Sequence, residues 1–146
     1  MSKVTRGGAA PDRQLSKLQR HILLWLYFQE TDGLENRVYE RVGDWSMVRL
    51  RNAIAEERKT IARIGISWSS EFCYGITPTK AQTAALSRAL HRLEKRGLVI
   101  LLSTSAKTNH KLSHTTHVKL TKFGRQPAAH LYLKWKDGIS TSEESL

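Results

Sequence analysis

The chain has 146 residues, and its 24 Lys and Arg side chains stand against 13 Asp and Glu, for a formal net charge of +11. With 40% hydrophobic residues and four Trp, the composition is that of one folded domain and excludes a disordered basic protein. The single cysteine, Cys73, excludes an intrachain disulfide framework and a multi-cysteine zinc site. Without a long apolar run or a secretory leader, the sequence predicts a cytoplasmic protein that does not enter a membrane.

The N-terminal part begins with a mobile tail over residues 1–12, followed by a first helix. From residue 14 to residue 30, apolar side chains recur every three or four positions, which predicts an amphipathic helix that begins near Asp12 and ends before Gly33. Leu24, Trp25 and Phe28 widen its apolar face. A face of this width is covered on two sides, either by the core and a later helix or by a second copy of the chain in a homodimer.

Two further helical segments follow. Residues 34–43 form a weaker one that ends near Gly43, and 46–64 form a longer one, capped by Asp44 or Ser46 and ended by Gly65. The apolar side of the longer helix consists of Met47, Leu50, Ile54, Ile61 and Ile64. Its surface mixes five bases with two acids, namely Arg49, Arg51, Arg58, Lys59 and Arg63 with Glu56 and Glu57. Such a mixture favours a solvated face over a second nucleic-acid site.

The middle of the chain predicts short elements that lead into another helix. Residues 66–68 are typical of a short strand, 69–74 of a short helix, and 75–78 of a turn. A helix over 79–96 follows, with Thr77 or Thr79 as its cap and Gly97 as its end. Its inward face consists of Ala85, Leu86, Ala89, Leu90 and Leu93.

A hairpin and a last helix complete the chain. Residues 99–104 predict a buried strand, 105–113 a loop, and 115–121 a returning strand in which apolar and polar side chains alternate. The last helical segment ends at Trp135 and is expected to break or kink at Pro127, which lacks a backbone N–H. Residues 137–146 predict a flexible tail. The fold class is therefore mainly α with a small β-hairpin (α+β).

The positive charge of the chain is concentrated in one region. Between residues 76 and 136, twelve Lys and Arg side chains stand against a single acid, Glu94, for a local balance of +11. The rest of the chain has twelve basic and twelve acidic residues and is neutral. A concentration of this kind is expected of a surface that binds a polyanion.

This region contains two sequence patterns, Leu86-Ser87-Arg88-x-Leu90-x-Arg92-Leu93-Glu94-x-Arg96-Gly97-Leu98-Val99 and Val118-x-Leu120-Thr121-x-x-Gly124-Arg125. Together they resemble the patterns of winged helix-turn-helix transcription regulators of the MarR/PadR type. The resemblance implies one winged-helix domain over 13–136, divided into a helical part (14–65), a helix-turn-helix with its wing (66–125) and a C-terminal helix (126–136). The chain departs from the family in its long wing loop and in the shortened or broken C-terminal helix that Pro127 predicts.

The resemblance further implies that the chain binds double-stranded DNA through a recognition helix over about 79–96 and a wing over about 99–121. The outward side of that helix consists of Thr79, Lys80, Gln82, Thr83, Ser87, Arg88, His91, Arg92 and Lys95. We expect Arg88 to contact guanine or phosphate and Gln82 to contact a base. The wing residues expected over a minor groove or phosphates are Lys107, Asn109, His110 and Lys111.

Other functions fit the sequence less well. His110, His114 and His117 lie close in sequence, but His114 and His117 would point to opposite faces of a strand, so we expect no metal site. No glycine elbow, phosphate loop or carboxylate cluster is present, so we expect no enzyme and no cofactor. The alternative to a transcription regulator or a plasmid- or phage-type DNA-binding factor is a protein- or RNA-interaction module. The absence of aromatic residues from 76–114 disfavours single-stranded RNA.

Overall fold

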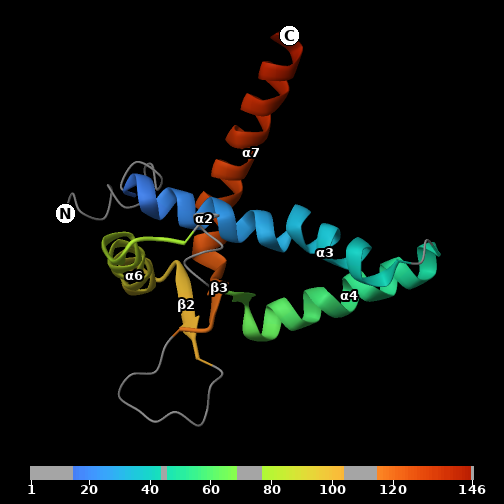
Figure 1. Ribbon diagram of the computed structural model, residues 1–146, viewed down its shortest axis with the longest axis horizontal. Helices are drawn as coiled ribbons and strands as arrows, with labels where there is room; N and C mark the ends of the chain where they lie inside the picture. The colour runs from blue at the N-terminus through green and yellow to red at the C-terminus, as the bar shows by residue number, and fades with distance from the viewer. Residues whose placement is uncertain (1–14, 44–45, 69–76, 104–114, 146) are drawn as a thin grey trace.

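The computed structural model describes residues 15–43, 46–68, 77–103 and 115–145, with residues 139–145 described by their backbone alone. It is mainly helical with one small antiparallel sheet, which confirms the α+β class (Figure 1). The predicted tail over 1–12, the short helix over 69–74 and the loop over 105–113 lie outside the described residues. In chain order the elements are α2 (Lys17–Glu30), α3 (Asp32–Val42), α4 (Met47–Ile64), β1 (Ile66–Ser67), α6 (Lys80–Lys95), β2 (Val99–Leu102), β3 (His117–Leu120) and α7 (Lys122–Ser145).

Helix α2 begins with a reciprocal cap that differs from the expected one. The Gln19 backbone N–H donates to the Ser16 hydroxyl at 3.1 Å, and the Ser16 N–H donates to Gln19 Oε1 at 3.0 Å. As predicted, this helix ends before Gly33, but the glycine does not terminate it, because the chain turns at Thr31 and Gly33 lies inside α3. The Thr31 hydroxyl donates to the Tyr27 carbonyl at 3.0 Å, so a side chain rather than a glycine satisfies the helix end.

Helices α3 and α4 form an antiparallel pair whose glycine ends were predicted. Gly43 ends α3 with φ +64°, and Gly65 follows α4 with φ +83°. Ser46 caps α4 by accepting from the Arg49 N–H at 3.4 Å. The prediction that Met47 lies on the buried side is wrong, since Met47 is 61% exposed. The reason is its place in the first turn of α4, which begins at the tip of the pair, far from the sheet (Figure 1).

The sheet has the strand order β1-β3-β2, with both pairs antiparallel. The returning strand β3 lies in the middle, where Ile66 of β1 is opposite Val118 and Val99 of β2 is opposite Leu120. Val118 and Leu120, the two β3 residues of these pairs, are buried, which confirms the alternation predicted for this strand. Strand β2 is less buried than predicted because Ile100 is 42% exposed.

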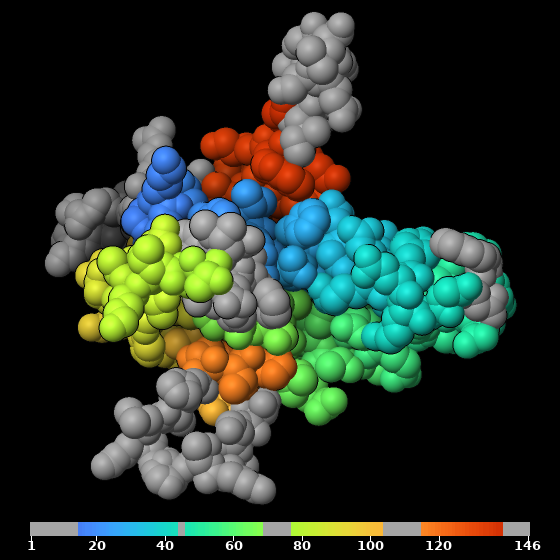
Figure 2. All heavy atoms as spheres, viewed as in Figure 1, coloured from blue at the N-terminus to red at the C-terminus, as the bar shows by residue number. Residues whose placement is uncertain are grey.

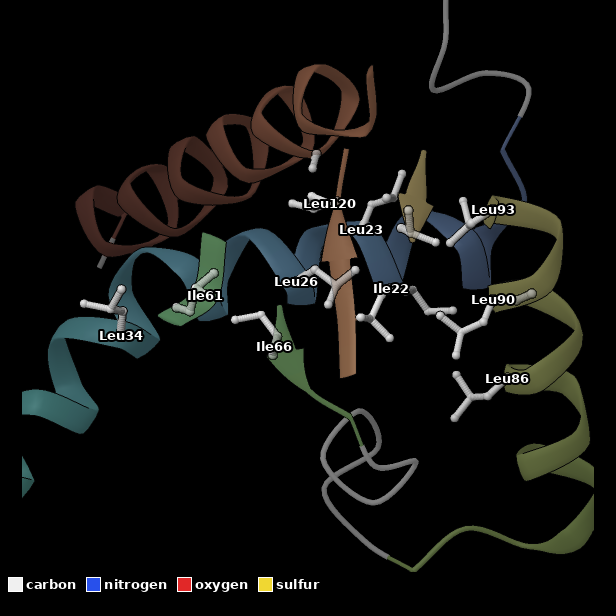
Figure 3. Close-up of a cluster of buried hydrophobic side chains, with 14 of the residues drawn as sticks. Ile22, Leu23, Leu26, Leu34, Ile61, Ile66, Leu86, Leu90, Leu93 and Leu120 are labelled. Carbon is white, nitrogen blue, oxygen red and sulfur yellow. The ribbon is translucent and has the colours of Figure 1, made fainter. Parts of the chain in front are cut away.

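The hydrophobic core is built around α2. Ile22, Leu23 and Leu26 have no exposed surface, and Figure 3 shows side chains of α6, the sheet and α4 directed toward this helix. Burial of apolar side chains of this size supplies roughly 1.5–3 kcal/mol each. The core therefore fixes the inward face of α6 and leaves the opposite face to solvent.

The wide apolar face of α2 is covered within one chain. On one side, the ring of Trp25 meets that of Trp68 edge-on at 5.5 Å, and on the α7 side Phe28 meets Trp135 edge-on at 5.7 Å. Helix α2 also contacts α6 and β3. The core and a later helix thus account for the width of this face, which gives no support to a homodimer through α2.

Helix α7 is longer than the sequence predicts. It runs from Lys122 to Ser145, so the predicted break at Pro127, the predicted end at Trp135 and, over residues 137–145, the predicted tail are wrong. Pro127 removes one backbone hydrogen bond and costs about 3 kcal/mol in an isolated helix. Packing on α2 and a hydrogen bond to α3 offset that cost, because Ala128 is fully buried and Tyr132 donates to Asp32 Oδ1 at 2.8 Å. The last turns of α7 extend away from the rest of the molecule (Figure 1).

Candidate nucleic-acid interface

Helix α6 is held at both ends by the signals that its sequence contains. At its start, the Gln82 N–H donates to the Thr79 hydroxyl at 3.1 Å, and the Thr79 N–H donates to Gln82 Oε1 at 2.9 Å. At its end, Gly97 has φ +78°, and the Leu98 N–H donates to the Leu93 carbonyl at 3.0 Å. These caps confirm the predicted helix to within one residue at each end.

The outward face of α6 is the one that sequence periodicity assigns to DNA. Eight of the nine predicted contact residues on this helix are exposed: Thr79, Lys80, Thr83, Ser87, Arg88, His91, Arg92 and Lys95. Gln82 is half-buried, and the cap already occupies its carbonyl oxygen. Of the Gln82 amide, only the NH₂ group is left for a base, which removes half of the donor–acceptor pair that recognises adenine.

The cations of α6 are free of carboxylates. In the described part of the chain, no ion pair involves Lys80, Arg88, Arg92 or Lys95, and all four side chains are exposed. Their charges add along one side of a helix whose only acid is Glu94. The surface is therefore a concentrated positive site suited to phosphates.

Two cations outside α6 are neutralised by acids from the N-terminal half. Arg125 Nη1 lies 2.6 Å from Glu30 Oε1, and Lys136 Nζ lies 3.1 Å from Asp32 Oδ2. Burial raises the pKa of the Glu30 carboxyl, and the opposing attraction of Arg125 is the smaller effect. The hydrogen bond and charge of Asp32 raise the pKa of Lys136. The positive surface is thus smaller than the local net charge of +11 between residues 76 and 136 suggests.

His91 is held in one orientation on the outward face. Its Nδ1 lies 2.8 Å from the Ser87 carbonyl oxygen, and because a carbonyl only accepts, Nδ1 is the protonated nitrogen in this contact. The other ring nitrogen, Nε2, stays available as an acceptor when the ring is neutral. His91 can therefore accept a hydrogen bond from a base amino group or, when protonated, donate one to a phosphate.

The hairpin beside α6 is described at its two strands, β2 and β3. The wing residues Lys107, Asn109, His110 and Lys111 lie outside the described residues. Of the three histidines weighed as metal ligands, only His117 is described, and its Nδ1 lies 3.1 Å from the Thr116 hydroxyl. Among the residues that the structure covers, no three metal-ligating side chains gather in one place.

Thr121 and Gly124 join the helix to the hairpin, a role that sequence analysis missed. The Thr121 hydroxyl donates to the Gly97 carbonyl at 2.6 Å and accepts from the Gly124 N–H at 3.0 Å, so it caps α7 and binds the end of α6. A Cβ on Gly124 would overlap the Leu98 carbonyl oxygen. The signal was present in the Thr-x-x-Gly spacing, which is that of a helix cap and its third residue.

A pocket of about 480 Å³ lies between α2, α3, α4 and the sheet. Its charged groups already have partners, since Arg37 donates to Gln29 Oε1 at 2.6 Å and lies 3.9 Å from a Glu57 oxygen. Within the described residues no buried side-chain polar atom lacks a partner. The pocket therefore offers no unsatisfied group for chemistry, and the α6 surface is the better candidate site.

Comparisons with protein-family models, curated proteins and solved structures found no match to this chain. The MarR/PadR resemblance accordingly stays a prediction from the two sequence patterns. Among the helices that the structure describes, none has both the length and the apolar character needed to cross a bilayer.

Proposed function

We propose that this protein binds duplex DNA through α6 and the adjoining hairpin, as a transcription regulator or a plasmid- or phage-type DNA-binding factor. One observation supports this most directly: among the described residues, the four exposed cations of α6 have no carboxylate partner, and they lie opposite the stripe that packs into the core. A protein that used α6 only for packing would have no need of an unneutralised basic face.

The order of elements supports a winged-helix arrangement. A short strand precedes α6, a hairpin follows it, and the sheet order is β1-β3-β2. In that arrangement the helix enters the major groove, which is wide enough for it, and the hairpin lies beside it. Thr83 and Ser87, nearer the start of α6, would face base edges, while Arg92 and Lys95, nearer its end, would face phosphates.

The proposal predicts a strong dependence on salt. Each phosphate neutralised by a Lys or Arg contributes about −0.9 to the slope of log affinity against log salt. If α6 and the wing together neutralise about seven phosphates, the slope is about −6.

Fluorescence anisotropy with a mixed-sequence duplex of about 30 base pairs tests the proposal across a salt series. We expect Arg88→Ala to weaken binding and to reduce the magnitude of the slope by about 1. Arg41→Ala is the matched control, because Arg41 is exposed on α3 and already paired with Glu57 at 3.4 Å. Undetectable binding at low salt, or an equal loss in both variants, would refute the proposal.

A protein-interaction module is the second candidate function, favoured by the surface of α7. Leu133 is 60% exposed and Trp135 38% exposed on this helix, which extends from the body (Figure 1). A module of this kind would tolerate loss of charge at Arg88 and Arg92, whereas a DNA-binding protein would not. The Arg88→Ala titration therefore separates the two functions.

A further inference from the structure

The outward face of α4 has a larger excess of positive charge than its sequence suggests. Glu57, one of its two acids, turns toward α3, where its carboxylate lies 3.4 Å from Arg41 Nη1 and 3.9 Å from Arg37 Nη2. Those two arginines come from another helix and neutralise it. The basic residues of α4 are thereby left with a single acid, Glu56, on the outward side.

The remaining cations of this face are exposed and weakly paired. Arg51, Arg58 and Arg63 are exposed and form no ion pair in the part of the chain that the structure describes. Lys59 lies 3.6 Å from Glu56, but both side chains are more than 70% exposed, so the pair contributes little and is easily exchanged for another anion. This face thus resembles α6 in being basic, exposed and largely without carboxylates. The sequence favours a solvated face here, and the pairing of Glu57 with α3 leaves that face more basic than the count of its residues suggests.

The end of α4 is fixed against the hairpin. A Cβ on Gly65 would lie 2.5 Å from the Val118 carbonyl oxygen of β3, so only glycine permits this approach. The left-handed φ of +83° imposes the same requirement. Figure 2 shows β3 (orange) between α6 (yellow-green) and α4 (green), and Figure 1 shows the two helices on opposite sides of the hairpin. The two basic helices therefore flank one rigid hairpin.

We propose that the exposed cations of α4, namely Arg51, Lys59 and Arg63 together with Arg58 at the edge toward α2, form a second phosphate-binding surface that contacts the backbone of the same DNA duplex on the far side of the hairpin. This inference rests on the proposed function of α6. Duplex DNA is the partner that fits, because phosphate contacts need only exposed cations along a line and no shaped pocket. A duplex of a few tens of base pairs is nearly straight, since its persistence length is about 150 base pairs. Contact with both helices consequently requires a minimum length of DNA.

The length requirement gives the test. We compare the triple variant Arg51→Gln, Arg58→Gln, Arg63→Gln with the wild-type protein on duplexes of about 30 and about 12 base pairs across a salt series. Glutamine keeps the helix propensity and removes only the charge. On the long duplex we expect weaker binding and a slope smaller in magnitude by about 2 to 3, one unit for each lost phosphate contact. On the short duplex, which α6 alone can hold, we expect the two proteins to bind alike.

The other outcomes overturn the inference in distinguishable ways. The wild-type protein binds both duplexes under the proposed function. If Arg88→Ala then binds DNA more weakly than the wild type while the α4 variant binds it equally well, the second surface is refuted and the proposed function stands. An equal loss on both duplexes also refutes it, because a flanking contact cannot act on DNA that does not reach it. If the wild-type protein binds neither duplex, both proposals fall. Arg41→Gln is the matched control for loss of one exposed arginine, and thermal unfolding shows that each variant is folded.

Discussion

Replacing Gly124 by alanine is expected to destabilise the protein, although the same exchange usually stabilises a helix. Gly124 lies in α7, where alanine is preferred to glycine by about 1 kcal/mol. The added Cβ would overlap the Leu98 carbonyl oxygen and lie 2.8 Å from the Leu98 carbonyl carbon. Both atoms belong to the backbone, so no side chain can rotate to make room.

The size of the effect follows from what has to move. Leu98 follows α6, and its carbonyl accepts from the Thr121 N–H at 3.1 Å. A shift of α7 away from Leu98 strains that hydrogen bond, whose loss costs about 1 kcal/mol, in addition to about 1–3 kcal/mol for overpacking. Even after the gain in helix propensity, we expect the free energy of unfolding to fall by about 1–3 kcal/mol. Urea unfolding followed by tryptophan fluorescence measures it, since Trp25 and Trp68 pack against each other in the core.

Gly138→Ala is the matched control in the same helix. Nothing lies within 4 Å of a Cβ at Gly138, so we expect a change between zero and about 1 kcal/mol in the stabilising direction. The opposite signs of the two substitutions are the result that matters. If Gly124→Ala also stabilises the protein, the close approach of α7 to Leu98 is wrong, and so is the explanation of this glycine.

Two further predictions concern the same region. Because burial raises the pKa of Glu30 above its ordinary value of 4.5, the stability that this group contributes is full below pH 4.5 and declines as the pH rises through the raised pKa. Glu30→Gln should therefore gain stability relative to the wild type between about pH 4 and pH 7 in urea unfolding, and a flat difference would contradict the effect of burial. Thr121→Val keeps the shape of the side chain but removes the hydroxyl that binds Gly97 and Gly124. We expect the free energy of unfolding to fall by about 1–2 kcal/mol without a change in helix content by circular dichroism. An unchanged free energy of unfolding would show that water replaces both contacts.

The local signals in the sequence were sufficient for most helices and strands. The 3.6-residue period and the Thr79 cap define α6, and the alternation around Val118 defines β3. One exception is a place where tertiary packing overrides a local preference. Pro127 is tolerated inside α7 because this helix packs on α2.

The electrostatics of the site could not be obtained from the sequence in the same way. Arg125 and Glu30 are 95 residues apart, and Glu57 pairs with arginines of a different helix. A count of charges along the chain treats all these groups as free. Only the packing of α2 against α7 and of α3 against α4 determines which are neutralised. The charge count therefore identified the basic region around α6 but treated the cations of α7 as free, although Arg125 and Lys136 are paired with acids of the N-terminal half.

The way α6 is attached makes its outward face open to mutational study. Its end is tied to the hairpin and to α7 by backbone groups of Gly97 and Leu98 and by the Thr121 hydroxyl. Its inward side is fixed by leucines that are almost fully buried. Neither attachment involves the exposed cations, so replacing Arg88 should alter DNA affinity while leaving the free energy of unfolding within about 0.5 kcal/mol of the wild type. A change in binding caused by Arg88→Ala would then report on the contact with DNA and not on loss of the fold.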